Sequence, residues 1–174
     1  MQDRRLDEIR AFFAQLMFAA SGSSDLRLQR ILAALPREAF LGPGPWKIMV
    51  GGQYMETPSP DPVYLYQNAL IALDESKSIN NGEPFLHARW LGASAIEPND
   101  DVTHVGAGTG CYTAIMSMLV LPHGSVTAFE IDRGLALRAA ENLKPFDNVS
   151  VIPGDATTAQ IPPSDVIYVN SGVI

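Results

Sequence analysis

The stretch DVTHVGAGTGCYTAIMSMLV, residues 101–120, decides the fold of this chain. It predicts an apolar strand over residues 101–105, a glycine-rich turn over 106–110 and a helix that begins at Cys111. Glycines at alternate positions let the backbone leave a buried strand sharply, and they place no Cβ in the way of a ligand. The free N–H groups at the start of the helix then point at that ligand. The unit predicts an α/β fold, a Rossmann-like doubly wound sheet that binds a nucleotide-like ligand at the turn.

The spacing of the glycines distinguishes between cofactors. Gly106, Gly108 and Gly110 follow the pattern Gly-x-Gly-x-Gly, and Cys111 stands where the dinucleotide pattern Gly-x-Gly-x-x-Gly has its last glycine. The spacing therefore favours S-adenosylmethionine as the cofactor. An NAD-binding Rossmann protein is the alternative that this spacing disfavours.

Three later strands are predicted to end beside the same turn. Residues 125–129 form one of them, and Glu130 closes it roughly twenty residues after the turn, where a carboxylate can accept from both hydroxyls of a ribose. Residues 148–152 lead to Asp155, which can accept from an adenine amine, and residues 165–169 form the last strand. The expected cofactor-binding residues are Gly106, Ala107, Gly108, Thr109, Gly110, Glu130, Ile131, Asp155, Ala156 and Asn170.

Counted from residue 101, these strands predict a sheet of order 3-2-1-4. We expect a helical arm with a Gly/Pro-rich loop over residues 1–75, and an S-adenosylmethionine-binding Rossmann-like domain over 76–174. Strand 4 is central in such folds but would here form an apolar edge with unpaired backbone groups. We expect that the chain is a fragment, incomplete at its C-terminus, or that the edge is covered by the arm or by a second copy in a homo-oligomer.

The arm itself is predicted from helical periodicity. Apolar residues share one face of a helix from about residue 3 to 20, and a second apolar stripe ends before Pro36. Serine-rich residues 21–24 offer the N-cap of this second helix. We expect the first stripe to face the core or a partner. It consists of Leu6, Ile9, Phe12, Phe13, Leu16, Met17 and Ala20, and the second stripe consists of Leu28, Ile31, Leu32 and Leu35.

The segment between the arm and the glycine turn is less regular. Residues 41–62 are rich in Gly and Pro, which is typical of a lid or of a linker. Residues 63–73 fit a helix or a strand. Pro84 suits the first turn of a helix through Ala95, with Phe85, Leu86, Trp90 and Leu91 available for burial.

Composition limits the partners and the compartment. The chain is 47% hydrophobic and 18% charged, with a net charge of −7, so a nucleic-acid backbone is not an expected partner. The single cysteine excludes an internal disulfide framework and a multi-cysteine metal site, and no metal site is predicted. No apolar run reaches the roughly 18 residues of a membrane span. The expected compartment is the cytoplasm.

Several segments together resemble one enzyme family. Residues 36–40, PREAF, resemble the Pro-Arg-Glu-x-Phe signature of the protein-L-isoaspartate O-methyltransferases. Residues 66–70, YQNAL, lie where that family has a Tyr-x-Asp element, and residues 80–86, NNGEPFL, align with its Thr-Ile-Ser-x-Pro substrate loop. Glu130 and the GDA of residues 154–156 continue the likeness, which runs from about residue 24.

This resemblance implies a class I methyltransferase that uses S-adenosylmethionine to O-methylate a protein or peptide carboxylate. A carboxylate is already ionised at pH 7 and needs no general base, so no catalytic residue is singled out. The implied substrate loop consists of Asn80, Asn81, Gly82, Glu83 and Pro84. Two alternatives are a methyltransferase with another acceptor, and a protein that binds S-adenosylmethionine without transferring its methyl group.

The chain departs from the family pattern at several positions. In the loop, Gly82 replaces the serine and Asn80 the threonine. Asn68 replaces Asp, and His104 stands where an acidic residue is usual. Because glycine offers no hydroxyl to orient an acceptor, we expect isoaspartyl peptides to be poor substrates and Gly82→Ser to improve them.

Other polar residues have structural interpretations. Asp132 is expected to be the N-cap of a helix over residues 133–143, and Cys111 a small packing residue. His104 is expected to be a core histidine, with His87 on a helix face and His123 in a turn.

Overall fold

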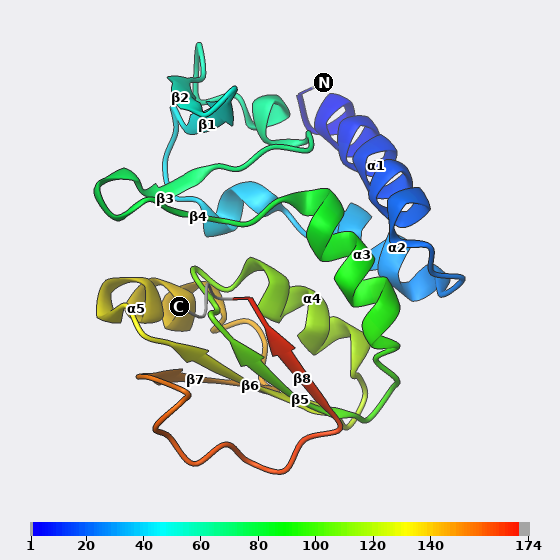
Figure 1. Ribbon diagram of the computed structural model, residues 1–174. Coiled ribbons are helices and arrows are strands. Elements are labelled where there is room, and N and C mark those ends of the chain that lie inside the picture. Colours follow the sequence, from blue (N-terminus) through cyan, green and yellow to red (C-terminus); the bar gives the residue numbers. More distant parts are fainter. Residues whose placement is uncertain (1, 171–174) are drawn as a thin grey trace. The chain divides into compact units, whose positions relative to one another are not determined.

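The computed structural model describes residues 2–170 of the chain (Figure 1). They divide into two compact units, of which the first ends at Ala93 and the second begins at Ser94. The first unit thus extends past the expected arm of residues 1–75. No helix within residues 2–170 combines the length and the hydrophobicity that a membrane crossing requires.

The first unit begins with two helices that pack against each other, α1 (Gln2–Ser21) and α2 (Leu26–Ala34). The N-cap of α2 is Asp25, whose carboxylate accepts from the backbone N–H of Arg27 at 2.9 Å. The expectation of a serine N-cap within residues 21–24 is therefore wrong. An aspartate caps a helix by the same acceptor chemistry, and its position directly before the helix decides the choice.

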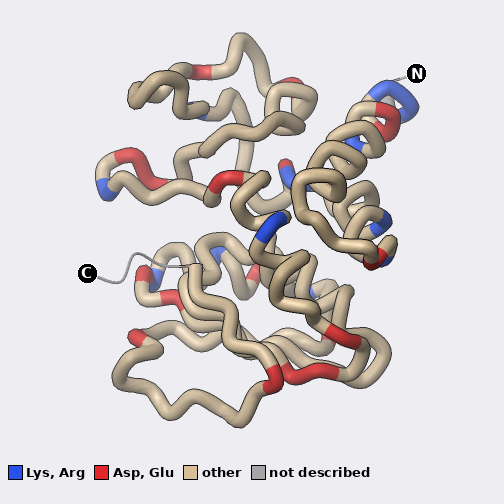
Figure 2. The backbone as a smooth tube through the Cα atoms, turned by 45° about the vertical axis from the view of Figure 1, so that its right-hand side comes forward, with Lys and Arg blue, Asp and Glu red and all other residues tan. Residues whose placement is uncertain are grey.

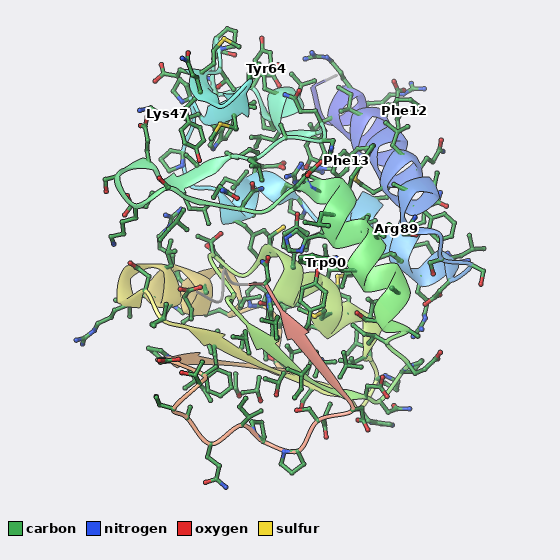
Figure 3. The ribbon with its side chains drawn as sticks, viewed as in Figure 1. Phe12, Phe13, Lys47, Tyr64, Arg89 and Trp90 are labelled. Atoms are coloured by element: carbon green, nitrogen blue, oxygen red, sulfur yellow. The ribbon has the colours of Figure 1, made fainter. Side chains whose placement is uncertain are left out.

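The apolar face of α1 is narrower than predicted. Phe13 and Met17 are buried, whereas Phe12 is 61% and Leu16 43% exposed. Figure 3 shows Phe12 and Phe13 on different sides of α1. Adjacent helix positions lie about 100° apart, so Phe12 and Phe13 cannot both face one narrow contact. Phe12 and Leu16 therefore do not join the core of the first unit, and whether they face a partner stays untested.

A polar cluster joins α1 to two 3₁₀ helices, η1 (Arg37–Phe40) and η2 (Pro62–Leu65). Arg10 on α1 donates through Nε to the Tyr66 hydroxyl at 2.7 Å and pairs with the carboxylate of Glu38. The Tyr66 hydroxyl in turn donates to Glu38. Burial and the bond to Glu38 raise the pKa of Tyr66, so the hydroxyl stays protonated and acts as a donor.

Arg37 extends this connection into the interior. Its side chain is buried, and Nη1 donates to the backbone carbonyls of Leu65 and Gln67, the latter at 3.3 Å. The guanidinium also lies over the Phe13 ring, 5.1 Å from its centroid. These contacts tie the PREAF segment to the Tyr66 segment.

We predict that Glu38→Ala lowers the free energy of unfolding by about 2 kcal/mol, because Arg10 and the Tyr66 hydroxyl lose a half-buried acceptor. The matched control is Glu8→Ala, which removes an exposed i, i+4 partner of Arg4 and should cost no more than about 0.5 kcal/mol. Urea unfolding of both variants measures the difference. Equal losses of unfolding free energy in the two variants would mean that the cluster stabilises the fold no more than an exposed ion pair does.

The Gly/Pro-rich segment forms an antiparallel hairpin of β1 (Lys47–Val50) and β2 (Gln53–Glu56). Gly51 and Gly52 form its tip, both at positive φ, as a two-residue hairpin turn requires. Trp46 at its base is buried and donates from Nε1 to the carbonyl of Gly42 at 3.0 Å. The segment is ordered structure, which neither the lid nor the linker interpretation anticipated.

The rest of the first unit consists of short elements followed by a helix. After η2 come β3 (Ala72–Asp74), η3 (Glu75–Lys77), β4 (Ile79–Asn80) and α3 (Pro84–Ser94). Strands β3 and β4 pair antiparallel. Helix α3 begins at Pro84 as predicted, but it buries His87, Ala88 and Leu91. The expected burial of Phe85, Leu86 and Trp90 is wrong, because each is at least 40% exposed.

The second unit is a parallel sheet of four strands with two helices. Its strands are β5 (Asp101–Val105), β6 (Ser125–Glu130), β7 (Val149–Pro153) and β8 (Val166–Val169), and its helices are α4 (Cys111–Leu119) and α5 (Arg133–Asn142). The order β7-β6-β5-β8 confirms the predicted 3-2-1-4 arrangement. Figure 1 shows α4 and α5 on one side of the sheet and the chain of residues 154–165 along the other.

Three sequence interpretations in this unit are confirmed. His104 is a core histidine, since its Nδ1 lies 2.8 Å from the Thr113 hydroxyl and its ring meets that of Tyr168 edge to face. Asp132 caps α5 by accepting from the Leu135 N–H at 3.0 Å. Cys111 is buried at the start of α4.

Candidate functional site

The glycine turn continues directly from β5. The N–H groups of Gly106 and Ala107 both donate to the carbonyl of Phe129, at 2.9 and 3.0 Å, so the turn stays attached to β6. Gly106, Gly108 and Gly110 have φ values of 85°, 57° and 95°. Glycine adopts such backbone angles without steric cost, which is why the sequence needs it at these three positions.

Glu130 lies at the centre of this turn. Its Oε2 accepts from the N–H of Gly108 at 2.6 Å, and its Oε1 accepts from the N–H of Asp132 at 2.9 Å. The side chain is buried. A carboxylate offers about four acceptor sites, so each oxygen can still accept from a further donor. The carboxylate is thus held in place by the protein and can still accept from a ligand.

The ends of the other strands meet at the same edge of the sheet. Gly154 donates from its N–H to the carbonyl of Glu130 at 2.9 Å, which brings Asp155 beside the end of β6. Asn170 donates from its backbone to the carbonyl of Val105 at 2.8 Å, beside the start of the turn. The structure therefore brings the predicted residues of all four strands together.

Asp155 and Ile131 differ in their surroundings. Oδ1 of Asp155 accepts from the hydroxyl and the N–H of Thr157, at 2.7 and 2.9 Å. These bonds lower the pKa of Asp155, which keeps the carboxylate charged. Ile131 follows Glu130 and is 71% exposed, so an apolar side chain stands free beside the carboxylate.

Other predicted site residues do not expose their side chains. The side chains of Ala107, Thr109 and Ala156 are buried. The carbonyl of Thr109 accepts from Nδ2 of Asn142 at the end of α5, at 2.9 Å. Sequence reasoning missed Asn142, because nothing local to an asparagine at the end of a helix signals a partner so far away along the chain.

The predicted substrate loop, residues 80–84, belongs to the first unit and is held by asparagines. Oδ1 of Asn80 accepts from the N–H of Gly82 at 2.9 Å, and Oδ1 of Asn81 accepts from the N–H of Ile71 at 2.8 Å. Asn81 also donates its own N–H to the Ile71 carbonyl at 3.0 Å. These bonds give the loop a defined conformation.

Asn68 connects the loop to the start of α3. Its Nδ2 donates to Oε1 of Glu83 at 2.6 Å, and its Oδ1 accepts from the N–H of Phe85 at 2.8 Å. An amide can donate and accept at once, whereas an ionised aspartate could only accept and would face the Glu83 carboxylate. The asparagine therefore suits the glutamate that this chain has in its loop.

Gly82 contacts His87 in a way that the sequence did not reveal. Its φ is 77°, and a Cβ built on it would lie 2.1 Å from Nε2 of His87. A serine at this position would thus overlap the imidazole. The expectation that Gly82→Ser simply adds a useful hydroxyl does not take this overlap into account.

His87 itself is neutral at ordinary pH. Burial, and secondly the positive charge of Arg37, lower its pKa to about 3. The unfolded chain binds a proton at this histidine below about pH 6.5, but the folded chain does not until near its own lower pKa. The stability contributed by this group is therefore complete above about pH 6.5 and is lost as the pH falls.

We predict that the free energy of unfolding of the first unit falls by about 2 kcal/mol between pH 7 and pH 5, and that His87→Leu removes most of this dependence. His123→Gln is the control, because His123 is an exposed turn residue. Urea unfolding across this pH range measures both. The same slope in His87→Leu and in the unmodified protein would contradict the assignment.

A sequence profile described as protein-L-isoaspartate(D-aspartate) O-methyltransferase matches residues 52–173, more than half of the chain. The chain belongs to this family. It is 28% identical over 154 residues to the protein-L-isoaspartate O-methyltransferase of Roseiflexus castenholzii, covering 86% of this chain and 61% of the relative. It is 30% identical over 174 residues to that of Koribacter versatilis, covering 97% and 67%.

Solved structures agree on the fold of this protein-L-isoaspartate O-methyltransferase family member. A protein-L-isoaspartate O-methyltransferase superposes with a TM-score of 0.76 at 25% identity, over 94% of this chain and 48% of that one. A putative enzyme of the same name from Plasmodium falciparum, solved with S-adenosyl-L-homocysteine, has a TM-score of 0.68 at 16% identity, over 92% and 72%. The chain thus spans about half to two thirds of the length of most of these relatives.

The PREAF segment, which resembles the signature of this family, has a structural role in the first unit. In this family member Arg37 and Glu38 of that segment hold the Tyr66 segment by the hydrogen bonds described above. Two of the segments that carried the family resemblance therefore contact each other in the fold of the first unit.

Proposed function

We propose that this chain binds S-adenosylmethionine at the strand ends of its second unit and transfers the methyl group to a carboxylate of a protein or peptide. The observation that carries the proposal is the buried carboxylate of Glu130, held by the N–H groups of Gly108 and Asp132. Each carboxylate oxygen of Glu130 can also accept a hydrogen bond from one ribose hydroxyl.

The residues around Glu130 fit an adenosyl ligand. The apolar side chain of Ile131 is exposed and suits the face of an adenine ring. Gly154 has no atom within 4 Å of the place where a Cβ would stand, so there is room beside Asp155. The Asp155 carboxylate is kept charged and can accept from the adenine amine. Glu130, Ile131 and Asp155 would therefore hold the nucleoside.

S-adenosylmethionine supplies an electrophilic methyl group when it is bound. The chain has to hold the cofactor and the acceptor so that the displacement occurs in line. The acceptor carboxylate is already ionised and needs no base. We assign the holding of the acceptor to the loop of residues 80–84, because its asparagine bonds give it a fixed conformation.

The nature of the acceptor is supported by the charge distribution. Lys and Arg residues are spread along the chain rather than gathered on one element (Figure 2). A phosphate backbone would need such a cluster. The charge distribution thus gives no support to a nucleic-acid acceptor. The partner that we propose is a protein or peptide, and the compartment that we propose is the cytoplasm.

The proposal can be tested by calorimetry with S-adenosylhomocysteine, S-adenosylmethionine and NAD. A methyl-release assay with an isoaspartyl peptide follows. We expect both adenosyl ligands to bind more tightly than NAD. We expect at most slow methyl transfer to the peptide, because Gly82 offers no hydroxyl to orient the acceptor. Binding without transfer to this peptide would favour another acceptor or a binding protein, and tighter binding of NAD would refute the cofactor assignment.

We also propose self-association through β8, which lies at the edge of the described sheet and pairs only with β5 there. An open strand edge pairs readily with a further strand. Light scattering over a dilution series checks this, and a monomer at every concentration would contradict it.

A further inference from the structure

We infer that His87 is a positioning residue for the loop of residues 80–84, the loop to which we assign acceptor binding. Its imidazole fills the space that a side chain at position 82 would occupy, and it thereby fixes the loop backbone that meets the acceptor. The role in acceptor binding rests on the proposed function. The steric relation between positions 82 and 87 does not.

The geometry at Gly82 makes the two positions mutually exclusive. Nε2 of His87 would lie 2.1 Å and Cδ2 2.7 Å from a Cβ at position 82, and real Cβ atoms essentially never approach other atoms so closely. The positive φ of 77° adds a strain that glycine alone avoids. A side chain at position 82 therefore requires the imidazole to move.

The imidazole has little freedom to move. His87 is 1% exposed on α3, and its ring meets the Trp90 ring edge to face, with the centroids 5.7 Å apart. Its backbone N–H donates to the carbonyl of Glu83 at 3.0 Å, which ties it to the loop. Asn68 fixes the same start of α3 through Phe85 and Glu83. His87 is thus held on several sides while its Nε2 faces the loop.

The charges around His87 favour a neutral imidazole. Glu83, whose backbone carbonyl accepts from the His87 N–H, has its carboxylate bonded to Asn68. The charged group identified as acting on His87 is Arg37, a cation, which disfavours a second positive charge. A neutral imidazole can fill the space behind the loop without repelling Arg37.

This arrangement has a consequence for the acceptor. The place of a side chain at position 82 is directed at His87, so the loop offers the acceptor its backbone and no hydroxyl. A loop that relaxes when the imidazole is removed would hold the acceptor less well, and a displacement of about 1 Å can cost roughly 100-fold in rate. His87 therefore acts on the acceptor through Gly82.

The first experiment measures the steric pair by thermal unfolding of Gly82→Ser, His87→Ala and the double variant. We expect Gly82→Ser alone to lower Tm by at least about 5 °C, through overpacking and backbone strain. In the His87→Ala background the same serine should cost less than about half as much. Equal costs in both backgrounds would overturn the inference, whether or not the protein transfers methyl groups.

The second experiment separates acceptor binding from cofactor binding. With an isoaspartyl peptide as the probe, His87→Ala should raise KM for the peptide by about 10-fold and leave the Kd of S-adenosylhomocysteine unchanged. Adding Gly82→Ser should restore KM to within about 3-fold, because its side chain refills the space. His87→Gln, which keeps a planar polar group, should show a smaller effect and replaces His87→Ala if that variant does not fold.

The outcomes distinguish this inference from the proposed function. An unchanged KM in His87→Ala, with active enzyme, would refute the positioning role. If the unmodified protein binds S-adenosylhomocysteine but does not methylate the peptide, the proposed acceptor is wrong, and the unfolding experiment still decides whether positions 82 and 87 exclude each other.

Discussion

Replacing Glu130 by alanine is expected to remove most of the affinity for S-adenosylhomocysteine and to loosen the glycine turn. Two ribose hydroxyls lose a charged acceptor, a loss of about 1.5 to 3 kcal/mol, which corresponds to roughly 10- to 150-fold in Kd. The N–H groups of Gly108 and Asp132 also lose their acceptor, which should lower the free energy of unfolding by about 2 to 4 kcal/mol.

Calorimetry and urea unfolding measure the two effects of Glu130→Ala separately. The matched control is Glu141→Ala, which removes an exposed carboxylate of the same unit that pairs with Lys144. This control should change neither property by more than about 0.5 kcal/mol. Unchanged binding of S-adenosylhomocysteine by Glu130→Ala would show that the ribose is not held there.

Gly110→Ala is expected to destabilise the second unit strongly, although it adds only one methyl group. A Cβ at this position would lie 2.7 Å from Cδ1 and 2.9 Å from Cγ of Leu143, a buried residue. The φ of 95° adds backbone strain. Overpacking of about 1 to 3 kcal/mol and strain of about 1 to 2 kcal/mol together predict a loss of about 2 to 5 kcal/mol in stability.

Gly154→Ala is the matched control for this prediction. Gly154 also has a positive φ, 149°, but no atom lies within 4 Å of its added Cβ, so it reports strain without overpacking. In the Leu143→Ala background the clash is absent. Gly110→Ala should therefore lower the stability less in that background than in the unmodified protein. If Gly110→Ala costs no more than Gly154→Ala, the contact with Leu143 is not limiting.

Much of the second unit could be predicted because its determinants are local. The strand, turn and helix of residues 101–120 follow from hydrophobic runs and glycine spacing, and the cap at Asp132 is a bond to a residue three positions away. The order of the parallel strands was expected from the Rossmann-like fold that this unit indicates. The carboxyl ends of parallel strands meet at one edge, so the convergence of Glu130, Asp155 and Asn170 could be foreseen.

The first unit was harder to predict, because its determinants lie far apart in the sequence. Arg10 and Tyr66, or Asn68 and Phe85, meet only after folding, and no periodic pattern announces such pairs. The exposure of Phe12 and the burial of His87 depend likewise on which neighbours cover each helix face. Secondary-structure propensity and hydrophobic periodicity predict structure poorly where tertiary contacts decide which short element forms.

The sequence by itself determined the glycine turn, the acidic residue that follows the second strand and the family, because each depends on residue types at fixed short spacings. Only the tertiary structure decided what Gly82 means. Read along the chain, it is a missing serine. In the fold it is the residue that leaves room for His87, because helix α3 returns the imidazole to the loop from which it starts.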